Sequence, residues 1–133
     1  MKYMIMLYGS QQDYDVLAGK PADKPPMSPE EIAAMHEHMG SFHERLAESG
    51  ELIDAQGLSA PVHARRVRMR SGVPAVTDGP YAETTEVLAG YTLVDCVSFD
   101  RATEIAAGLV DPADEASYVD VRPVIEGVDE LEV

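Results

Sequence analysis

The segment from Thr77 to Asp95 constrains the fold most, because it begins as a turn and ends as a strand with few polar positions. Asp78-Gly79-Pro80 favours a turn, since Asp accepts local backbone hydrogen bonds, Gly tolerates positive φ and Pro fixes its own φ. From Val87 to Cys96 most residues are β-branched, aliphatic or aromatic, which is typical of a strand covered on both faces. A sheet that contains such a strand needs a layer on each side.

Two further segments carry strong local signals. Lys2–Tyr8 is nearly all apolar or aromatic, which predicts a second strand inside the sheet. A helix is predicted from Pro29 to Ser49, because Ser28 and Glu31 form a capping box at its start and Gly50 follows its end.

The other elements follow from shorter patterns. Gly9–Met27 is polar and proline-rich, so we expect an irregular loop there and treat it as a candidate lid. Val62–Arg70 alternates, and Ser71-Gly72 turns it into Val73–Thr77, which predicts a β-hairpin. The remaining predicted elements are a strand at Glu51–Leu58, a helix at Phe99–Leu109 capped by Ser98 or Asp100, a strand at Ser117–Ile125 and an acidic tail at Glu126–Val133.

The order of these elements predicts an α+β fold. A β-α-β-hairpin-β-α-β order is that of the ferredoxin-like split βαβ arrangement, an antiparallel sheet with both helices on one face. Helices then cover one face only, whereas Lys2–Tyr8 and Val87–Cys96 are apolar on both. We therefore expect a second copy of the sheet to cover the other face, which makes the protein a homodimer.

Length and composition bound the class of protein. A chain of 133 residues suits a single domain, residues 1–133, and 45% hydrophobic residues are ordinary for a globular protein. A formal net charge of −14 argues against nucleic acid or anionic membranes as partners. Cys96 is the single cysteine, so an internal disulfide is excluded, and we expect a buried side chain in a cytoplasmic protein.

Several phrases of the chain resemble one family. They are MKYMIMLYG at the start, Asp78-Gly79-Pro80-Tyr81-Ala82-Glu83 followed by Gly90-Tyr91, and VDVRPVIEG near the end. This pattern resembles the YCII-related proteins with a DGPF phrase, in which Phe is usual where this chain has Tyr81. The resemblance implies a dimeric α+β barrel. It also implies a pocket between the long helix and the sheet, where a His and an Asp act on a small organic molecule. No cofactor is expected, because the chain has no Walker loop and no G-x-G-x-x-G phrase.

Candidate catalytic residues are Asp78, His36 and His43. Asp78 is either a base on a rigid turn or the cap of that turn. His36 and His43 share one helix face with Gly40 between them, and this face either lines a cavity or meets solvent. Two histidines seven residues apart are a weak metal signal, so no metal is expected. The ligand-binding candidates are Tyr8, Gly40, Tyr81, Tyr91 and Arg122.

Arg66, Arg68 and Arg70 fall on one face of the predicted hairpin. They form either a solvated edge that blocks association between sheets or a site for an anion.

The sequence leaves open whether the protein is an enzyme. The first hypothesis is a small-molecule-binding protein with proton-transfer, lyase-like chemistry. The second, also implied by the resemblance, is a non-catalytic binding or regulatory module linked to sigma-factor control. The third is a monooxygenase-like α+β barrel of the cofactor-free kind.

Overall fold

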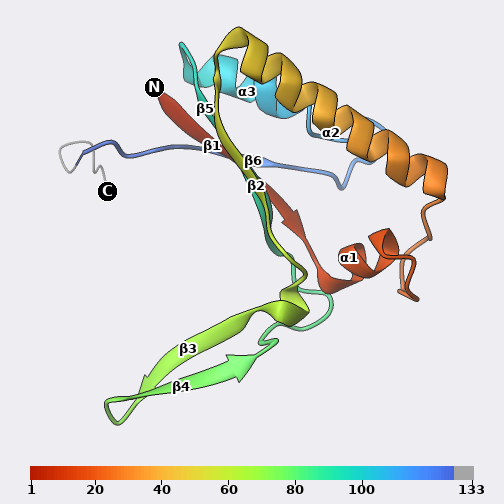
Figure 1. Cartoon of the computed structure of the whole chain (residues 1–133), viewed down its shortest axis with the longest axis vertical. Helices are drawn as coiled ribbons and strands as arrows, with labels where there is room; N and C mark the ends of the chain where they lie inside the picture. Colours follow the sequence, from red (N-terminus) through yellow and green to blue (C-terminus); the bar gives the residue numbers. More distant parts are fainter. Residues whose placement is uncertain (128–133) are drawn as a thin grey trace. The chain divides into compact units, whose positions relative to one another are not determined.

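The structure, a computed structural model, describes residues 1–127. Within them the fold is mixed α+β, with three α-helices, a four-stranded antiparallel sheet and a two-stranded hairpin (Figure 1). The elements are β1 (Lys2–Gly9), α1 (Gln11–Leu17), α2 (Pro29–Ser49), β2 (Leu52–Gly57), the 3₁₀ turn η1 (Pro61–His63), β3 (Arg65–Arg70), β4 (Val73–Asp78), β5 (Val87–Asp95), α3 (Phe99–Ala107) and β6 (Asp120–Pro123).

The chain divides into two compact units, and each is described by itself. The first unit comprises Met1–Leu7, His36–Gln56 and the chain from Gly90 onward, and the second comprises Tyr8–Met35 and Gly57–Ala89. Apart from Glu126 and Gly127, the predicted acidic tail lies outside the described residues.

The sheet has the strand order β2-β5-β1-β6. The two segments predicted to lie inside the sheet, now β1 and β5, are indeed its two central strands. β6 pairs antiparallel with β1, with Ile5 opposite Val121, and it is shorter than predicted. It ends at Pro123, and a proline within a sheet is confined to edge positions of this kind because it has no N–H to donate.

The core of the first unit lies on one face of this sheet. Along β5, Gly90, Thr92 and Val94 are buried, whereas Tyr91 and Leu93 between them are only half-buried. Side chains from β1, α2, β5, α3 and the position after β5 fill the core: Tyr3, Ile5, Phe42, Leu46, Val94, Cys96, Ala102, Ile105 and Ala106. Tyr91 and Leu93 point to the opposite face of the sheet and are not among the residues of this core cluster.

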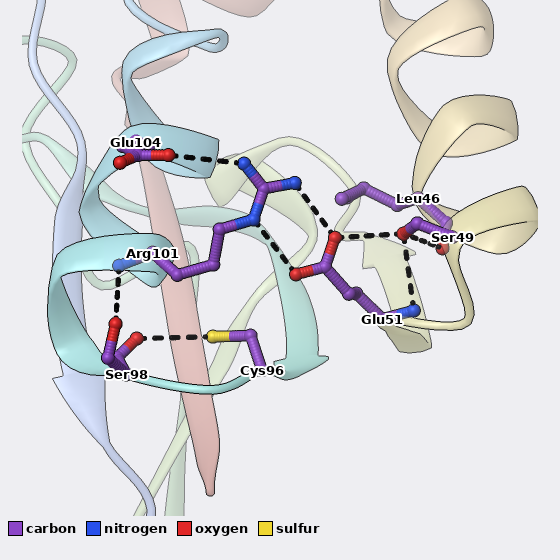
Figure 2. A network of polar contacts seen from close by, with 7 residues as sticks. All are labelled: Leu46, Ser49, Glu51, Cys96, Ser98, Arg101 and Glu104. Atoms are coloured by element: carbon purple, nitrogen blue, oxygen red, sulfur yellow. Dashed lines mark hydrogen bonds and ion pairs between the residues drawn. The ribbon is translucent and has the colours of Figure 1, made fainter.

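Arg101 ties the start of α3 to the start of β2. Its Nε and Nη2 donate to Glu51 Oε2 and Oε1 at 3.0 and 2.8 Å, and Nη1 donates to Glu104 at 3.3 Å (Figure 2). Hydrogen bonds from Arg101 are the main reason why the pKa of the Glu51 carboxyl is lowered. Ser98 is the cap of α3, since its Oγ accepts from the Arg101 backbone N–H at 3.0 Å. Cys96 is buried as predicted, and its thiol donates to the Ser98 carbonyl at 3.4 Å.

The long helix begins and ends as predicted. The Glu31 backbone N–H donates to Ser28 Oγ and the Ser28 N–H donates to Glu31 Oε1, both at 3.1 Å, which is a complete capping box. Gly50 has φ +79°, the left-handed conformation that favours glycine after a helix.

The prediction that Gly9–Met27 is wholly irregular was wrong. α1 occupies Gln11–Leu17, and Ser10 and Asp13 form a capping box at its start. All three prolines of the segment follow this helix, so they do not interrupt it. The helix ends before them, with Ala18 as its C-cap and Gly19 at φ +73°. Tyr14 fixes the helix within its unit, because its hydroxyl donates to the Leu58 carbonyl at 2.8 Å.

The hairpin of β3 and β4 is confirmed. Ser71 and Gly72 have φ of 49° and 80°, and positive φ at both central residues is the pattern of a type I′ turn.

No helix within residues 1–127 is long and apolar enough to span a bilayer.

Candidate functional site

A hollow in the second unit is the first candidate site, and we call it the Tyr81 groove. It has a volume of about 330 Å³, within the lower part of the range found for small-molecule sites. Its walls come from the segment after β2, from η1, from the loop after β4 and from the start of β5. The lining residues are Leu58, Ser59, Ala60, Pro61, Ala64, Tyr81, Val87 and Leu88.

Backbone hydrogen bonds hold the walls of the Tyr81 groove. The Leu58 N–H donates to the Ala89 carbonyl at 2.8 Å, and the Ala64 N–H donates to the Pro61 carbonyl at 3.0 Å. The Gly79 N–H donates to the Ala64 carbonyl at 2.8 Å, which fastens the Asp-Gly-Pro turn to the segment after η1. The groove is thus largely pre-formed by main-chain contacts.

Gly79 is needed in this wall for two reasons. Its φ is +55°, and a Cβ added there would lie 3.4 Å from the Val62 carbonyl oxygen. A side chain at this position would therefore strain the backbone and press on the neighbouring segment.

Tyr81 is the aromatic side chain of the groove. It is 38% exposed, and the Arg66 guanidinium carbon lies 5.2 Å from the centre of its ring, which is a cation–π contact. The phenol ring therefore has a cation beside it while part of its surface stays open.

Asp78 does not point its carboxylate into its own turn. It ends β4 opposite Arg65, whose Nε donates to Asp78 Oδ1 at 3.1 Å, and its side chain is 80% exposed. The interpretation of this carboxylate as the cap of the turn was wrong, because its partner is a side chain across the hairpin. An ion pair this exposed contributes little to stability.

In the first unit, His43 is anchored to the sheet. Its Nε2 lies 3.0 Å from Thr92 Oγ1, and Thr92 is only 1% exposed. The ring also meets Phe42 edge-on, with 5.3 Å between ring centres. The hydroxyl of a buried threonine requires a partner, so this contact gives His43 a structural role.

The rest of the column predicted around His43 faces outward. His36 and Gly40 are exposed, and no atom lies within 4 Å of a Cβ built on Gly40. Within the described residues this face of α2 is open at His36 and Gly40. These two residues therefore meet solvent and do not line a cavity. His38, which was not a predicted site residue, contacts the Gly108 carbonyl through Nε2 at 2.7 Å.

Tyr91 and Asp54 form a second polar pair in this unit. The Tyr91 hydroxyl donates to Asp54 Oδ2 at 2.8 Å, and this hydrogen bond lowers the pKa of Asp54 and raises that of Tyr91. Sequence reasoning missed Asp54, although an acidic residue inside a predicted strand was the available signal.

Comparison with known proteins decides the family. Residues 1–127 match the YCII-related domain. The chain belongs to the YCII-related family. An uncharacterized protein of Rhizobium meliloti (strain 1021) is 32% identical to it over 97 residues, which are 73% of this chain and 78% of that protein.

The site residues predicted for this YCII-related protein are divided between the two units. Tyr81 and Asp78 belong to the second unit, while His36, Gly40 and His43 belong to the first, and each unit is described by itself. Arg122 is exposed on β6 opposite Met4, and Tyr8 is half-buried near the end of β1.

Another hollow of this YCII-related protein lies between α2 and α3 in the first unit, and sequence reasoning missed it. It has a volume of about 240 Å³ and is lined by Phe42, Arg45, Leu46, Ser49, Arg101, Glu104, Ile105 and Gly108. Arg101 is already held by Glu51 and Glu104 there. Among residues 1–127, no three His, Cys, Asp or Glu side chains gather as a metal site requires.

Proposed function

We propose that this YCII-related protein binds a small organic molecule in the Tyr81 groove. The observation that supports the proposal is the groove itself, about 330 Å³ of hollow with walls of Leu58, Ala60, Pro61, Val87 and Leu88. Sites for small molecules are mostly apolar and carry a few polar groups that set orientation. The Tyr81 hydroxyl and Ser59 are the polar side chains of this groove.

The lining sets the class of ligand. Apolar walls favour a molecule with an aliphatic or aromatic body, because burying apolar surface stabilises the complex by roughly 25 cal/mol per Å². The Tyr81 hydroxyl and the Arg66 guanidinium beside its ring favour a carboxylate or carbonyl group on that body. We therefore propose a small carbonyl compound or carboxylic acid of largely apolar surface.

We also propose that Asp78 acts as a base and accepts a proton from the bound compound. Asp78 stands in the same phrase as Tyr81, and its carboxylate is accessible at 80% exposure. To act as a base it must be released from Arg65, its partner at 3.1 Å.

We also propose that the protein is a homodimer with a ferredoxin-like barrel architecture. The support is the open face of the first unit's sheet, where Tyr91 and Leu93 are half-buried and Ile53 is 44% exposed. A sheet face with these side chains is apolar enough to pack on a copy of itself across a two-fold axis.

The ligand proposal is tested by thermal shift with a library of small carbonyl compounds and carboxylic acids. A compound that raises the unfolding temperature of the wild type should fail to do so for Ala64→Leu, which fills the groove. Ala47→Leu, an equal change at an exposed position of α2, should keep the shift. Retention of the shift by Ala64→Leu, or no shift by any compound, would contradict the proposal.

Asp78→Asn separates binding from proton transfer. The amide keeps the shape of the side chain but cannot accept a proton at neutral pH. Binding by this variant with loss of turnover of the bound compound supports the base. Turnover equal to that of the wild type removes Asp78 from the chemistry.

A further inference from the structure

The hairpin of β3 and β4 differs in charge from the rest of the chain. Four of the ten lysine and arginine residues stand at Arg65, Arg66, Arg68 and Arg70, and the only acid in residues 65–78 is Asp78. Four cations and one acid give the hairpin a net charge of +3, whereas six cations against 23 acids give the other 119 residues −17. The hairpin is therefore a small basic element on a strongly acidic protein.

Its two faces have different chemistry. In the register of the hairpin, Val67 is opposite Val76 and Met69 is opposite Pro74, which gives one apolar face. Arg66, Arg68 and Arg70 point to the other face, because successive side chains of a strand alternate. Arg66 contacts Tyr81, but within residues 1–127 the side chains of Arg68 and Arg70 have no polar partner.

The apolar face is open to solvent. Val67, Met69 and Val76 are 63%, 64% and 58% exposed, and they are contiguous across the two strands. A two-stranded hairpin is at best marginally stable in water without a covering layer. A row of arginines on an edge hairpin can be explained as a way to prevent association between sheets. This explanation does not account for the contiguous exposed apolar side chains on the other face.

We infer that this hairpin is an arm that a second copy of the chain covers on both faces, so that acidic side chains meet Arg68 and Arg70 and apolar side chains meet Val67, Met69 and Val76. The remainder of each copy carries −17, so a second copy offers the complementary charge to Arg68 and Arg70. In a two-fold dimer each copy gives and receives one arm, so every contact is made twice. Nucleic acid is the weaker occupant, because the acidic remainder repels phosphate.

The inference rests on the proposed homodimer and adds a second contact to it. The experiment is sedimentation equilibrium of the full chain, which yields the dissociation constant of the dimer. Arg68→Glu/Arg70→Glu should raise that constant roughly 10- to 100-fold, because attraction at two sites becomes repulsion. Lys20→Glu/Arg45→Glu, with the same change in net charge at exposed positions off the hairpin, should change it less than about 3-fold.

A second pair of changes tests the apolar face without altering charge. Val67→Thr/Val76→Thr keeps β-branched side chains in register, so the hairpin should stay folded by circular dichroism. The dimer constant should again rise roughly 10-fold, because apolar surface no longer becomes buried. Raising NaCl from about 50 to about 500 mM should narrow the difference in dimer dissociation constant between the wild type and Arg68→Glu/Arg70→Glu, because salt screens the charges of the arm.

The outcomes distinguish the contact made by the hairpin arm from the contact between sheet faces proposed above. A wild-type dimer whose constant is unchanged by both hairpin variants overturns the arm and leaves the dimer standing. A monomeric wild type overturns both. Leu93→Glu changes the sheet face and leaves the hairpin intact. If Leu93→Glu still dimerises while the hairpin variants do not, the result supports the arm and contradicts the contact between sheets. Binding of a DNA or RNA duplex that is lost in the arginine variant, with dimerisation unchanged, also overturns the arm.

Discussion

Replacing Thr92 with valine tests whether His43 is a structural anchor. Thr92 is 1% exposed on β5, and its hydroxyl lies 3.0 Å from His43 Nε2. Valine has nearly the same shape, so Thr92→Val removes the hydroxyl with little change in packing. The imidazole nitrogen then loses its partner at a half-buried position.

The expected loss of stability comes from His43 Nε2, which is left without its hydrogen-bond partner. Leaving a buried polar group without a hydrogen bond costs about 1–3 kcal/mol, whereas removing both partners is often nearly neutral. We therefore expect Thr92→Val to lower the free energy of unfolding by about 1–2 kcal/mol, since His43 is only partly buried. The unfolding temperature should fall by several degrees, as for other domains of this size.

The assay is urea unfolding followed by circular dichroism for the wild type, Thr92→Val, His43→Leu and the double variant. The cycle should give a coupling energy of about 1 kcal/mol, because the two residues share one hydrogen bond. Ser49→Ala is a matched control, since it also removes a hydroxyl that is hydrogen-bonded but lies at the exposed end of α2. Strict additivity of the two single changes, or a Thr92→Val variant as stable as the wild type, would refute the anchor and return His43 to the group of functional candidates.

Two further predictions concern α2 and the start of β2. Gly40→Ala should raise the free energy of unfolding by about 0.5–1 kcal/mol in urea, because Gly40 is helical and the space around its Cβ is open; a loss of stability would indicate an unrecognised contact. The pKa of Glu51 is lowered in the folded state by Arg101, so its contribution to stability is complete above the ordinary glutamate pKa of about 4.3 and is lost as the pH falls toward the folded value. Glu51→Gln should therefore be less stable than the wild type at neutral pH, with the difference closing below about pH 4. A difference that stays constant from neutral pH to about pH 3 would contradict this assignment.

Elements with strong local signals could be predicted from the sequence. The bounds of α2 follow from Ser28, Glu31 and Gly50, because a capping box and a left-handed glycine act within a few residues. α1 shows the limit of this reasoning. Its Ser10–Asp13 capping box is equally local, but the prolines that follow it concealed a helix of seven residues.

The candidate site was predicted less well than the fold. Tyr81 was identified and does line a groove, yet the groove also needs Leu58 and Val87, which are far from each other in sequence. Asp78 was identified by residue type and turn chemistry, but its partner is Arg65 across the hairpin. Asp54 and the hollow between α2 and α3 were missed, because nothing in the local pattern marks which side chains will meet.

Apart from α1, the sequence by itself determined the order of the main helices and strands, the two central strands and the alternation of the hairpin. These properties depend on side-chain periodicity and on backbone preferences, which are local. Only the tertiary structure decided that His43 meets Thr92, 49 positions away, while His36 and Gly40 on the same helix face solvent. The physical reason is that a helix pattern identifies a face, whereas the packing of that face on a particular strand decides which residues along it become buried.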